Sequence, residues 1–318
     1  MNNITVNARE FDSAVRFAEK GALRDESRTL HHIALEVDGD DLLVIGCDGF
    51  RLHGGRVDIQ DSHIDPNAPV DHSKSRAQWF MDARDALAGI RAFKKSFKPK
   101  KGDLMTLMLG DMGLTILKNG KGSVTVPKDN YGTGSRGARY TDITYPDWRQ
   151  IMPVDECRMV VVDVGQLQPI LKEIVAEGKA NKKAIPVAWI REDCHTGTLA
   201  VRTQRPHHRR EKVYSYRESE YRMEVVEYSR AQFRDVVGSV SFTADPGEKR
   251  VDLCVDARYL LDALSGMDGV ATIEVRDRVY GQPVVVRDDK GNLGIVMPVK
   301  KWEVTGLKRY KDKKVGED

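Results

Sequence analysis

The segment DARYLLDAL, residues 256–264, has three counterparts in the chain. They read NAREFDSAV (7–15), DARDALAGI (82–90) and DVGQLQPIL (163–171). Each begins with Asn or Asp, whose side chains cap helix N-termini, and continues with apolar residues at helical spacing. Four amphipathic helices are therefore predicted, with Pro169 in or near the first turn of the third.

Short apolar segments around these helices are predicted to be strands. One precedes each helix, at residues 4–6, 79–81, 159–162 and 253–255. Alternating apolar residues, separated by turn sequences such as DGDD, follow the first, second and fourth helices. The repeated unit is one strand, one helix and about three antiparallel strands, used four times. It predicts the α+β fold class, with helices gathered on one side of antiparallel sheets.

The length of 318 residues exceeds what one hydrophobic core usually supports, so two domains are expected. Two repeated units per domain place the boundary near residues 152–156. The predicted domains are residues 1–153 and 154–302, and residues 303–318 form a charged C-terminal tail that is either a solvated end or a contact for DNA or a partner.

The overall charge excludes a uniformly basic protein but leaves nucleic-acid binding open. Lysine and arginine number 51 against 48 acidic residues, a net charge of +3, within which a basic face can be clustered. The N-terminus has no signal-peptide pattern, and no apolar run is long enough for a transmembrane helix. A cytoplasmic protein is therefore expected.

The cysteines are far apart, contain no C-x-x-C pair and are expected to be reduced thiols. They are Cys47, Cys157, Cys194 and Cys254. A zinc site would have to combine Cys194 with His195, His207 and His208, and that set lacks the second cysteine of a usual zinc finger. No metal or other cofactor is predicted.

The helix predicted from Asp82 to about residue 98 carries separate apolar and basic arcs. The apolar arc contains Ala83, Leu87, Ile90 and Phe97, and the basic arc contains Arg84, Arg91, Lys95 and Lys98. Basic residues also lie on or just after the first and third helices, among them Arg16, Lys20, Arg24, Lys172 and Lys179. A solvated face is the ordinary explanation for one such helix. Equivalent helices that share the charge indicate a surface for the phosphate backbone of a duplex.

The sequence carries no enzyme motif and no catalytic residue is assigned. No nucleophile elbow, P-loop, H-E-x-x-H or dinucleotide-binding motif occurs in the right context. Asp48, followed by a glycine, is expected to form an Asx-turn. His31 and His32 are expected at a surface turn. The glycine-rich run at 131–140 is expected to be a loop.

Three separated motifs, GCDGFRL (46–52), TYPDWRQIMP (144–153) and LGIVMPVK (293–300), give the chain a family resemblance. Together with VDARYLLDAL (255–264), they resemble the bacterial DNA polymerase III beta subunit, the sliding clamp. The family pattern is a T-D-G-H-R-L turn, an F-P-D-Y-x-x-[VIL]-x-P junction and a V-M-P-[MV]-[RK] chain end. The resemblance implies a non-enzymatic processivity factor: a ring around duplex DNA, with helices lining the hole.

The family's protomer has three domains of two units each, whereas two domains are expected here, resembling the family's middle and last domains. Three copies of this chain would again supply six domains, and head-to-tail contacts are the kind that close rings. The DNA-clamp fold and a homotrimeric ring are therefore expected. The alternative is a clamp-derived DNA-binding or regulatory protein that never closes a ring. A nuclease is disfavoured because no metal-carboxylate cluster is evident.

The resemblance also implies a pocket between the two domains for short linear peptides of a DNA polymerase and a clamp loader. Carried over by position, its residues are Leu30, Cys47, Gly49, Phe50, Arg51, Leu52, Pro146, Gln150, Ile151, Val296, Met297 and Pro298. Two of these depart from the family, since Phe50 replaces a histidine and Gln150 an arginine. The alternative is that these residues only seal the interface between the domains.

The resemblance also implies DNA-binding residues, at positions that face DNA in the family. They are Arg24, Arg84, Arg91, Lys95 and Lys98. Sliding requires many weak, salt-sensitive contacts to phosphates and no reading of the bases, so each residue is expected to contribute modestly.

Overall fold

The structure is a computed structural model. It describes residues 2–23, 29–64, 70–71, 76–110, 113–118, 121–127, 147–152, 157–180, 186–193, 197–217, 220–244, 251–275, 282–299 and 302–308. Within β12 and β13, described below, only the backbone is described for residues 204–217 and 220–237. We refer to residues 2–152 as the N-terminal half and to residues 157–308 as the C-terminal half.

The described residues contain four α-helices, and all four predicted positions are confirmed. They are α1 (Ala8–Gly21), α2 (Ala83–Phe97), α3 (Val164–Ala180) and α4 (Ala257–Leu264). The predicted caps are present: Asn7 accepts from the Arg9 amide at 2.9 Å, Asp82 from the Arg84 amide at 2.7 Å, and Asp256 from the Arg258 amide at 2.9 Å. Two 3-10 helices, η1 (Thr29–His31) and η3 (Trp148–Ile151), lie in the N-terminal half.

Pro169 lies inside α3, at the start of its second turn, which agrees with its predicted place in or near the first turn. The Asp163 side chain accepts a 2.9 Å hydrogen bond from the Gln166 amide, and helix α3 therefore begins well before the proline. The carbonyl left without a donor belongs to Gly165, which is exposed, so water can bind it.

The strands pair in antiparallel ladders throughout. In the N-terminal half they are β1 (Asn2–Asn7), β2 (His32–Asp38), β3 (Asp41–Cys47), β4 (Arg51–His63), β5 (Val70–Asp71), β6 (Arg76–Asp82), β7 (Leu104–Gly110), β8 (Gly113–Lys118) and β9 (Lys121–Pro127). In the C-terminal half they are β10 (Arg158–Asp163), β11 (Val187–Asp193), β12 (Thr198–Arg217), β13 (Glu220–Ala244), β14 (Asp252–Asp256), β15 (Val270–Val275), β16 (Val284–Arg287), β17 (Leu293–Val296) and β18 (Trp302–Lys308).

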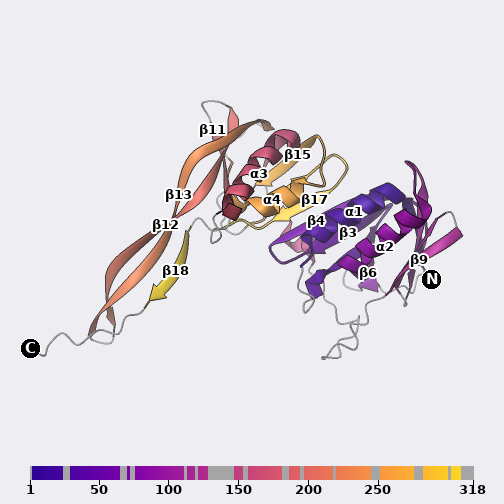
Figure 1. Ribbon diagram of the computed structural model, residues 1–318, viewed down its shortest axis with the longest axis horizontal. Coiled ribbons are helices and arrows are strands. Elements are labelled where there is room, and N and C mark those ends of the chain that lie inside the picture. Colours follow the sequence, from indigo (N-terminus) through magenta and orange to yellow (C-terminus); the bar gives the residue numbers. More distant parts are fainter. Residues whose placement is uncertain are drawn as a thin grey trace, which may run out of the picture.

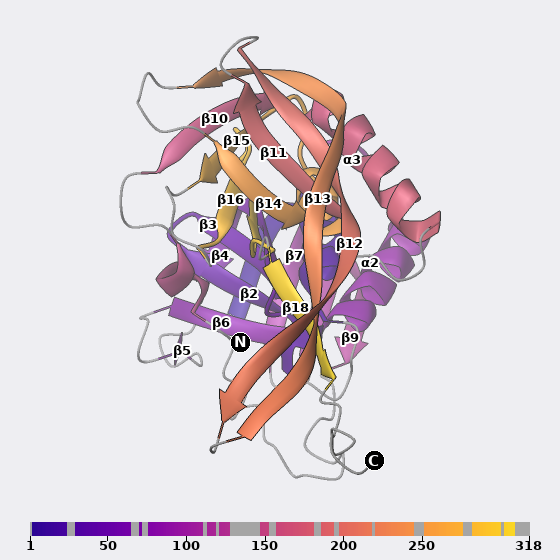
Figure 2. The ribbon, with the colours of Figure 1, turned by 90° about the vertical axis from the view of Figure 1, so that its left-hand side faces the viewer.

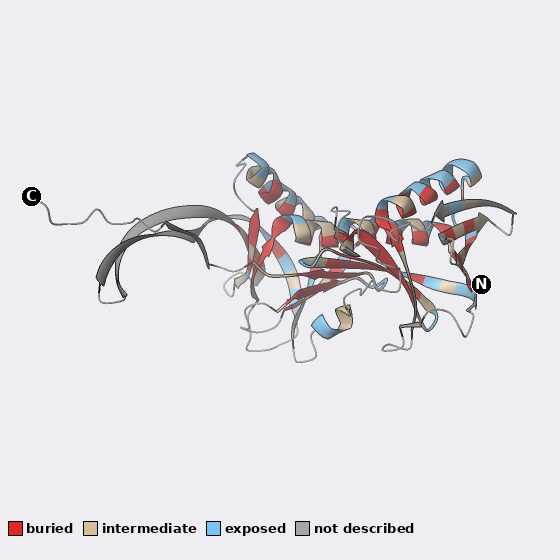
Figure 3. Cartoon of the chain, turned by 90° about the horizontal axis from the view of Figure 1, so that it is seen from below, coloured by how far each residue is buried: buried red, intermediate tan, exposed pale blue. Residues whose placement is uncertain are grey.

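The two halves repeat one arrangement. In the N-terminal half the ladders run β6–β2–β3–β4 and β4–β1–β7–β8–β9, and in the C-terminal half β14–β11–β12–β13 and β13–β10–β15–β16–β17. Strand β17 pairs with β4, so a continuous sheet joins the halves. The helices stand together on one side of the sheets, which confirms the predicted α+β architecture (Figures 1 and 3).

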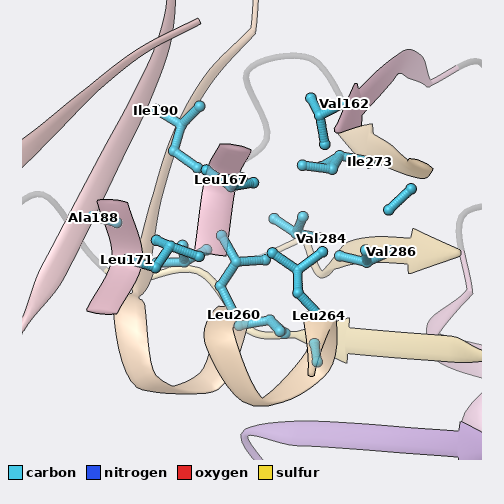
Figure 4. Close-up of a cluster of buried hydrophobic side chains, with 14 of the residues drawn as sticks. Val162, Leu167, Leu171, Ala188, Ile190, Leu260, Leu264, Ile273, Val284 and Val286 are labelled. Atoms are coloured by element: carbon cyan, nitrogen blue, oxygen red, sulfur yellow. The ribbon is translucent and has the colours of Figure 1, made fainter. Parts of the chain in front are cut away.

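Each half has its own apolar core. The N-terminal core combines α1 and α2 residues such as Phe11 and Ile90 with strand residues such as Leu35. Figure 4 shows the C-terminal core, where Leu171 of α3 and Leu260 of α4 face the valines of β16. A small third cluster lies where the halves meet and contains Ala34, Ile45, Cys47, Leu52, Val285, Leu293 and Ile295. We call it the junction cluster.

Strands β12 and β13 extend far beyond the body as a hairpin that the sequence did not predict (Figures 1 and 2). Their pairing runs from Thr198↔Ser241 to Arg217↔Glu220, with register shifts at Val201/Arg202 and Arg202/Thr203. Strand β18 pairs with β13 from Arg230 to Val225, so residues 303–308 of the predicted tail form a strand along this hairpin. We call the β12–β13 extension with β18 the arm.

In the described part of the chain, no helix combines the length and apolar character needed to cross a lipid bilayer.

Candidate functional site

The turn from Asp48 to Arg51 is held by the Asp48 carboxylate. Its Oδ1 accepts hydrogen bonds from the amides of Phe50 and Arg51, both at 2.9 Å. Gly49, between Asp48 and Phe50, has φ +90°, a conformation that residues with a Cβ rarely adopt. The predicted Asx-turn is confirmed, and Asp48 acts as the residue that shapes this turn.

Arg51 connects this turn to helix α4. Its Nε donates a hydrogen bond to Asp48 Oδ2 at 3.0 Å, and its Nη1 donates one to Asp262 Oδ2. Its guanidinium also lies 4.5 Å from the centre of the Tyr259 ring. The side chain is only 15% exposed, so the charge depends on these partners. Burial, with the nearby Asp48 and Asp256 carboxylates, raises the pKa of Tyr259 above its usual value.

Strand pairing brings the first and third sequence motifs together. Arg51 pairs with Val296 and Leu52 with Ile295, and the Met297 amide donates to the Phe50 carbonyl at 2.8 Å. The second motif reaches the same place, because Trp148 and Met152 pack against the junction cluster. Three motifs far apart in the sequence therefore meet where the two halves join.

The residues named for the peptide pocket divide into a buried and an accessible group. Cys47, Leu52 and Val296 are at most 6% exposed and lie beneath the surface. Phe50 is 63% exposed and Ile151 42%. Gln150 is exposed, and Leu30, Gly49, Arg51, Met297 and Pro298 are intermediate or exposed. Pro146 lies outside the described residues.

Several residues at the junction were missed by sequence reasoning. Tyr259 and Asp262 of α4 contact Arg51, and Arg149 forms a 2.6 Å ion pair with the buried Glu36 while lying 4.2 Å from the Trp148 ring centre. Tyr259 and Asp262 lie three residues apart, on one side of α4, and this spacing is the local signal that the sequence offers. Their partner on the other half could not be read from that signal.

His53 is completely buried at the same junction. Its ring stacks on Phe17 with centroids 4.8 Å apart, its Nδ1 lies 3.1 Å from the Phe17 carbonyl, and its Nε2 has no partner among the described groups. Burial lowers the pKa of His53 to about 3, and the charges of Arg51 and Lys20 act in the same direction while the Phe17 carbonyl opposes them. The ring is therefore neutral in the folded protein.

This burial predicts an acid sensitivity. The unfolded chain binds a proton at His53 below about pH 6.5 and the folded chain only near pH 3, so stability falls with pH in that window. The expected loss from this residue is about 1.4 kcal/mol per pH unit below pH 6.5. The free energy of unfolding, measured with urea at several pH values, should depend less steeply on pH in His53→Phe than in the wild type. The substitution retains a ring that can stack on Phe17. Equal slopes would contradict the assignment.

His31 and His32 are buried, at 3% and 1% exposure, so their predicted surface position is wrong. Their rings lie 3.8 Å apart, and His31 Nε2 lies 3.5 Å from Asp82 Oδ2. His31 ends η1 and His32 begins β2, where it pairs with Asp82, the residue that caps α2. A two-residue sequence cannot reveal this packing.

The four predicted cations of α2 are exposed on the helix side of the molecule. They are Arg84, Arg91, Lys95 and Lys98. Figure 3 shows the exposed residues of the helices on the side away from the sheets. Arg24 lies outside the described residues.

Charge neutralisation on this face is uneven. Asp12 of α1 pairs with Arg16 at 2.8 Å and with Lys94 of α2 at 2.6 Å. Arg91 and Lys95 form no ion pair with any residue that the structure describes. The helix side therefore retains positive charge suited to phosphate groups.

The structure offers no support for the incomplete zinc set. Cys194 and His195 lie outside the described residues, and the side chains of His207 and His208 are not described either. Among the residues that are described, no three His, Cys, Asp or Glu side chains converge on a metal-sized site.

Comparison with solved structures identifies the fold. The chain superposes on the DNA polymerase sliding clamp from Pseudomonas aeruginosa with a TM-score of 0.62 and 16% identity, over 94% of this chain and 66% of that one. For the DNA polymerase III beta subunit from Thermotoga maritima the TM-score is 0.60, with 15% identity and the same coverage. A putative beta subunit from Eubacterium rectale gives 0.62 at 11% identity, over 93% of this chain and 65% of that one.

These likenesses show that the chain has the sliding-clamp fold. No protein-family model matches the sequence, and no curated protein matches it either. The chain spans slightly less than two thirds of the length of the clamps it superposes on.

Proposed function

We propose that this chain, which has the sliding-clamp fold, is a DNA sliding clamp. It would be a non-enzymatic processivity factor that encircles duplex DNA and tethers a polymerase to it. The observation that carries the proposal is the basic face of α2, on the side of the molecule where all four helices gather. In a ring with the helices inward, Arg84, Arg91, Lys95 and Lys98 face the duplex.

The proposed interaction with DNA is electrostatic. Arginine and lysine contacts to phosphates supply affinity without reading bases, which permits sliding. Exposed basic side chains on α1 and α3, such as Lys20 and Lys172, add positive charge to the helix side of the molecule. Arg24 is proposed as a further contact from its sequence position.

The proposed ring contains three copies. The two repeated halves correspond to the domains proposed at 1–153 and 154–302, so three copies supply six clamp domains. Closing the ring would cover sheet edges that otherwise invite aggregation. The β4–β17 ladder supports this picture, because it is an example within one chain of two clamp domains joined through their sheet edges.

The junction of the two halves is the proposed docking site for short linear peptides of a polymerase or clamp loader. Phe50 and Ile151 expose apolar side chains there, although most large apolar residues of the body are buried. The accessible part of the proposed pocket also includes Leu30, Gly49, Arg51, Gln150, Met297 and Pro298, and the buried Cys47, Leu52 and Val296 lie beneath it. Pro146 is proposed as a member from its sequence position alone. Phe50 in place of the family's histidine makes the site more apolar.

Light scattering with and without nicked circular DNA tests the ring. The expected mass is three times the 35.8 kDa of one chain, at least when DNA is present. The protein should remain bound to circular DNA through washing at about 0.2 M salt and slide off the linearised form. A monomer under all conditions, with equal retention on both DNA forms, would favour the alternative of a clamp-derived DNA-binding protein that does not close a ring.

A further inference from the structure

The arm is built differently from the rest of the molecule. From Gln204 outward, β12 and β13 pair only with each other and with β18 among the described strands. Figure 1 shows this ribbon standing clear of the four helices. A single layer of two or three strands has no second layer with which to form a core, so its residues are not needed to bury apolar surface. The sequence of the arm is therefore available for another role.

Thr203 shows which face of the ribbon continues the inner side of the body sheet. It is 8% exposed and pairs with Ala188, which belongs to the C-terminal core. Successive residues of a strand alternate between two faces, and the register of β12 with β13 shows no shift beyond Thr203. Arg205, His207 and Arg209 therefore share a face of the ribbon with Thr203. We call it the core-side face of the arm.

The partner strand adds further basic residues to the core-side face. Arg230 and Arg234 of β13 both occupy this face in the register with β12. From the Thr203↔Arg234 pair outward to the Arg209↔Tyr228 pair, the face holds four arginines and neither an aspartate nor a glutamate. Like charges on neighbouring strands repel one another, and a bound polyanion relieves that repulsion.

The opposite face of the same stretch is different. Arg210 lies there, but its register partner is Glu227, and Glu303 of β18 pairs with the adjacent Ser229. Opposite charges on paired residues compensate each other. On the core-side face the first acidic residue of the arm is Glu211, one position beyond the stretch. The uncompensated positive charge is therefore concentrated on one face, near the base of the arm.

Aromatic residues are interleaved with the arginines of the core-side face. Tyr228 pairs with Arg209, and Trp302, the first residue of β18, pairs with Arg230. The basic arc of α2, in contrast, contains only arginine and lysine. Arginines alternating with aromatic residues are typical of surfaces that bind single strands, because unpaired bases stack on rings and on guanidinium groups while the phosphates bind the cations. A duplex already has its bases stacked inside, so it gains little from the rings.

We propose that the core-side face of the arm is a binding site for single-stranded DNA. Its arginines bind the phosphates, and its aromatic residues stack on the bases. The residues of the site are Arg205, Arg209, Arg230, Arg234, Tyr228 and Trp302. The site goes beyond the function proposed above, in which the α2 face binds the duplex. A clamp with this arm holds duplex DNA through its helices and an unpaired strand through its arm.

Fluorescence anisotropy of the full chain tests the site. The probes are a labelled oligothymidylate of about 20 nucleotides, which does not pair with itself, and a labelled duplex of the same length. Tyr228→Val with Trp302→Val should lower affinity for the single strand at least about tenfold and leave affinity for the duplex unchanged. Valine is suited to a strand, so the substitutions preserve the propensity of β13 and β18.

Two further variants separate the role of the rings from a general disturbance of the arm. Tyr228→Phe with Trp302→Phe retains aromatic rings and should retain most of the affinity for the single strand. Phe233→Val with Tyr214→Val removes two aromatic residues from the opposite face and should leave affinity unchanged.

The arginines are tested by charge. Arg205→Gln with Arg230→Gln should weaken binding of the single strand and make its salt dependence shallower, by about 0.7 in the slope of log affinity against log salt for each phosphate no longer neutralised. Arg210→Gln with Lys212→Gln is the matched control, because it removes the same charge from the opposite face.

Four outcomes would overturn the proposal. They are a wild type that does not bind the single strand, an equal loss when the opposite face is changed, an equal loss for duplex and single strand in the valine variant, and an equal loss in the phenylalanine variant. Failure of the proposed function is recognised separately. In that case Arg91→Gln with Lys95→Gln leaves duplex affinity intact, whatever the arm variants do to the single strand.

Discussion

Replacing Arg91 and Lys95 together by glutamine is expected to lower affinity for duplex DNA at least about tenfold at 0.1 M salt. Both side chains are exposed on the helix face and form no ion pair with a described residue, so their charge is available to phosphates. The slope of log affinity against log salt should also become shallower, by about 0.9 for each phosphate that the variant no longer neutralises. Fluorescence anisotropy with a labelled duplex at several salt concentrations measures both quantities.

The matched control for charge is Arg56→Gln with Lys290→Gln. Arg56 lies on β4 and Lys290 in the turn between β16 and β17, neither belongs to a helix, and both are exposed and paired with acids. This variant has the same net charge as the first. An equal loss of affinity in both variants would mean that overall charge, and not the α2 face, binds the duplex.

Arg51→Ala is expected to reduce the free energy of unfolding by about 2 to 3 kcal/mol. The substitution removes ion pairs to Asp48 and Asp262 and the packing against the Tyr259 ring, and it leaves the 7%-exposed Asp48 side chain without its cation. Urea unfolding measures the decrease. Arg51→Lys retains the charge but cannot bridge two carboxylates in the same geometry, so it should recover only part of the stability.

Arg16→Ala provides the comparison for an exposed pair. Arg16 is 43% exposed and pairs with Asp12 within α1, a type of pair worth only about 0.3 to 0.5 kcal/mol. If Arg51→Ala were no more destabilising than Arg16→Ala, Arg51 would not be a structural link between the halves.

Much of the fold could be predicted because its signals are local. Asn7, Asp82 and Asp256 cap their helices, and the apolar residues that follow each cap are buried. Capping and helical periodicity depend on a few neighbouring residues, so they are visible in any one repeat. Repetition of the same pattern four times then strengthened the prediction of an α+β fold. Asp48 was predicted correctly as a turn residue for the same local reason.

The candidate site could be predicted only in part. The motifs around Arg51 and Ile295 do meet, but the sequence did not show that Leu52 and Cys47 are buried while Phe50 and Ile151 are exposed. Which residue of a joint reaches the surface depends on how the two halves pack. The arm was not predicted from the sequence either.

The sequence by itself determined the repeated unit, the helix starts, the Asx-turn and the fold class, because each follows from interactions between residues close in the chain. Only the tertiary structure decided that Arg51 links to Asp262, that His53 and the His31–His32 pair are buried, and that β17 joins β4. These interactions connect segments far apart in the sequence. Their geometry is set by the packing of two cores against each other, and no local pattern records it.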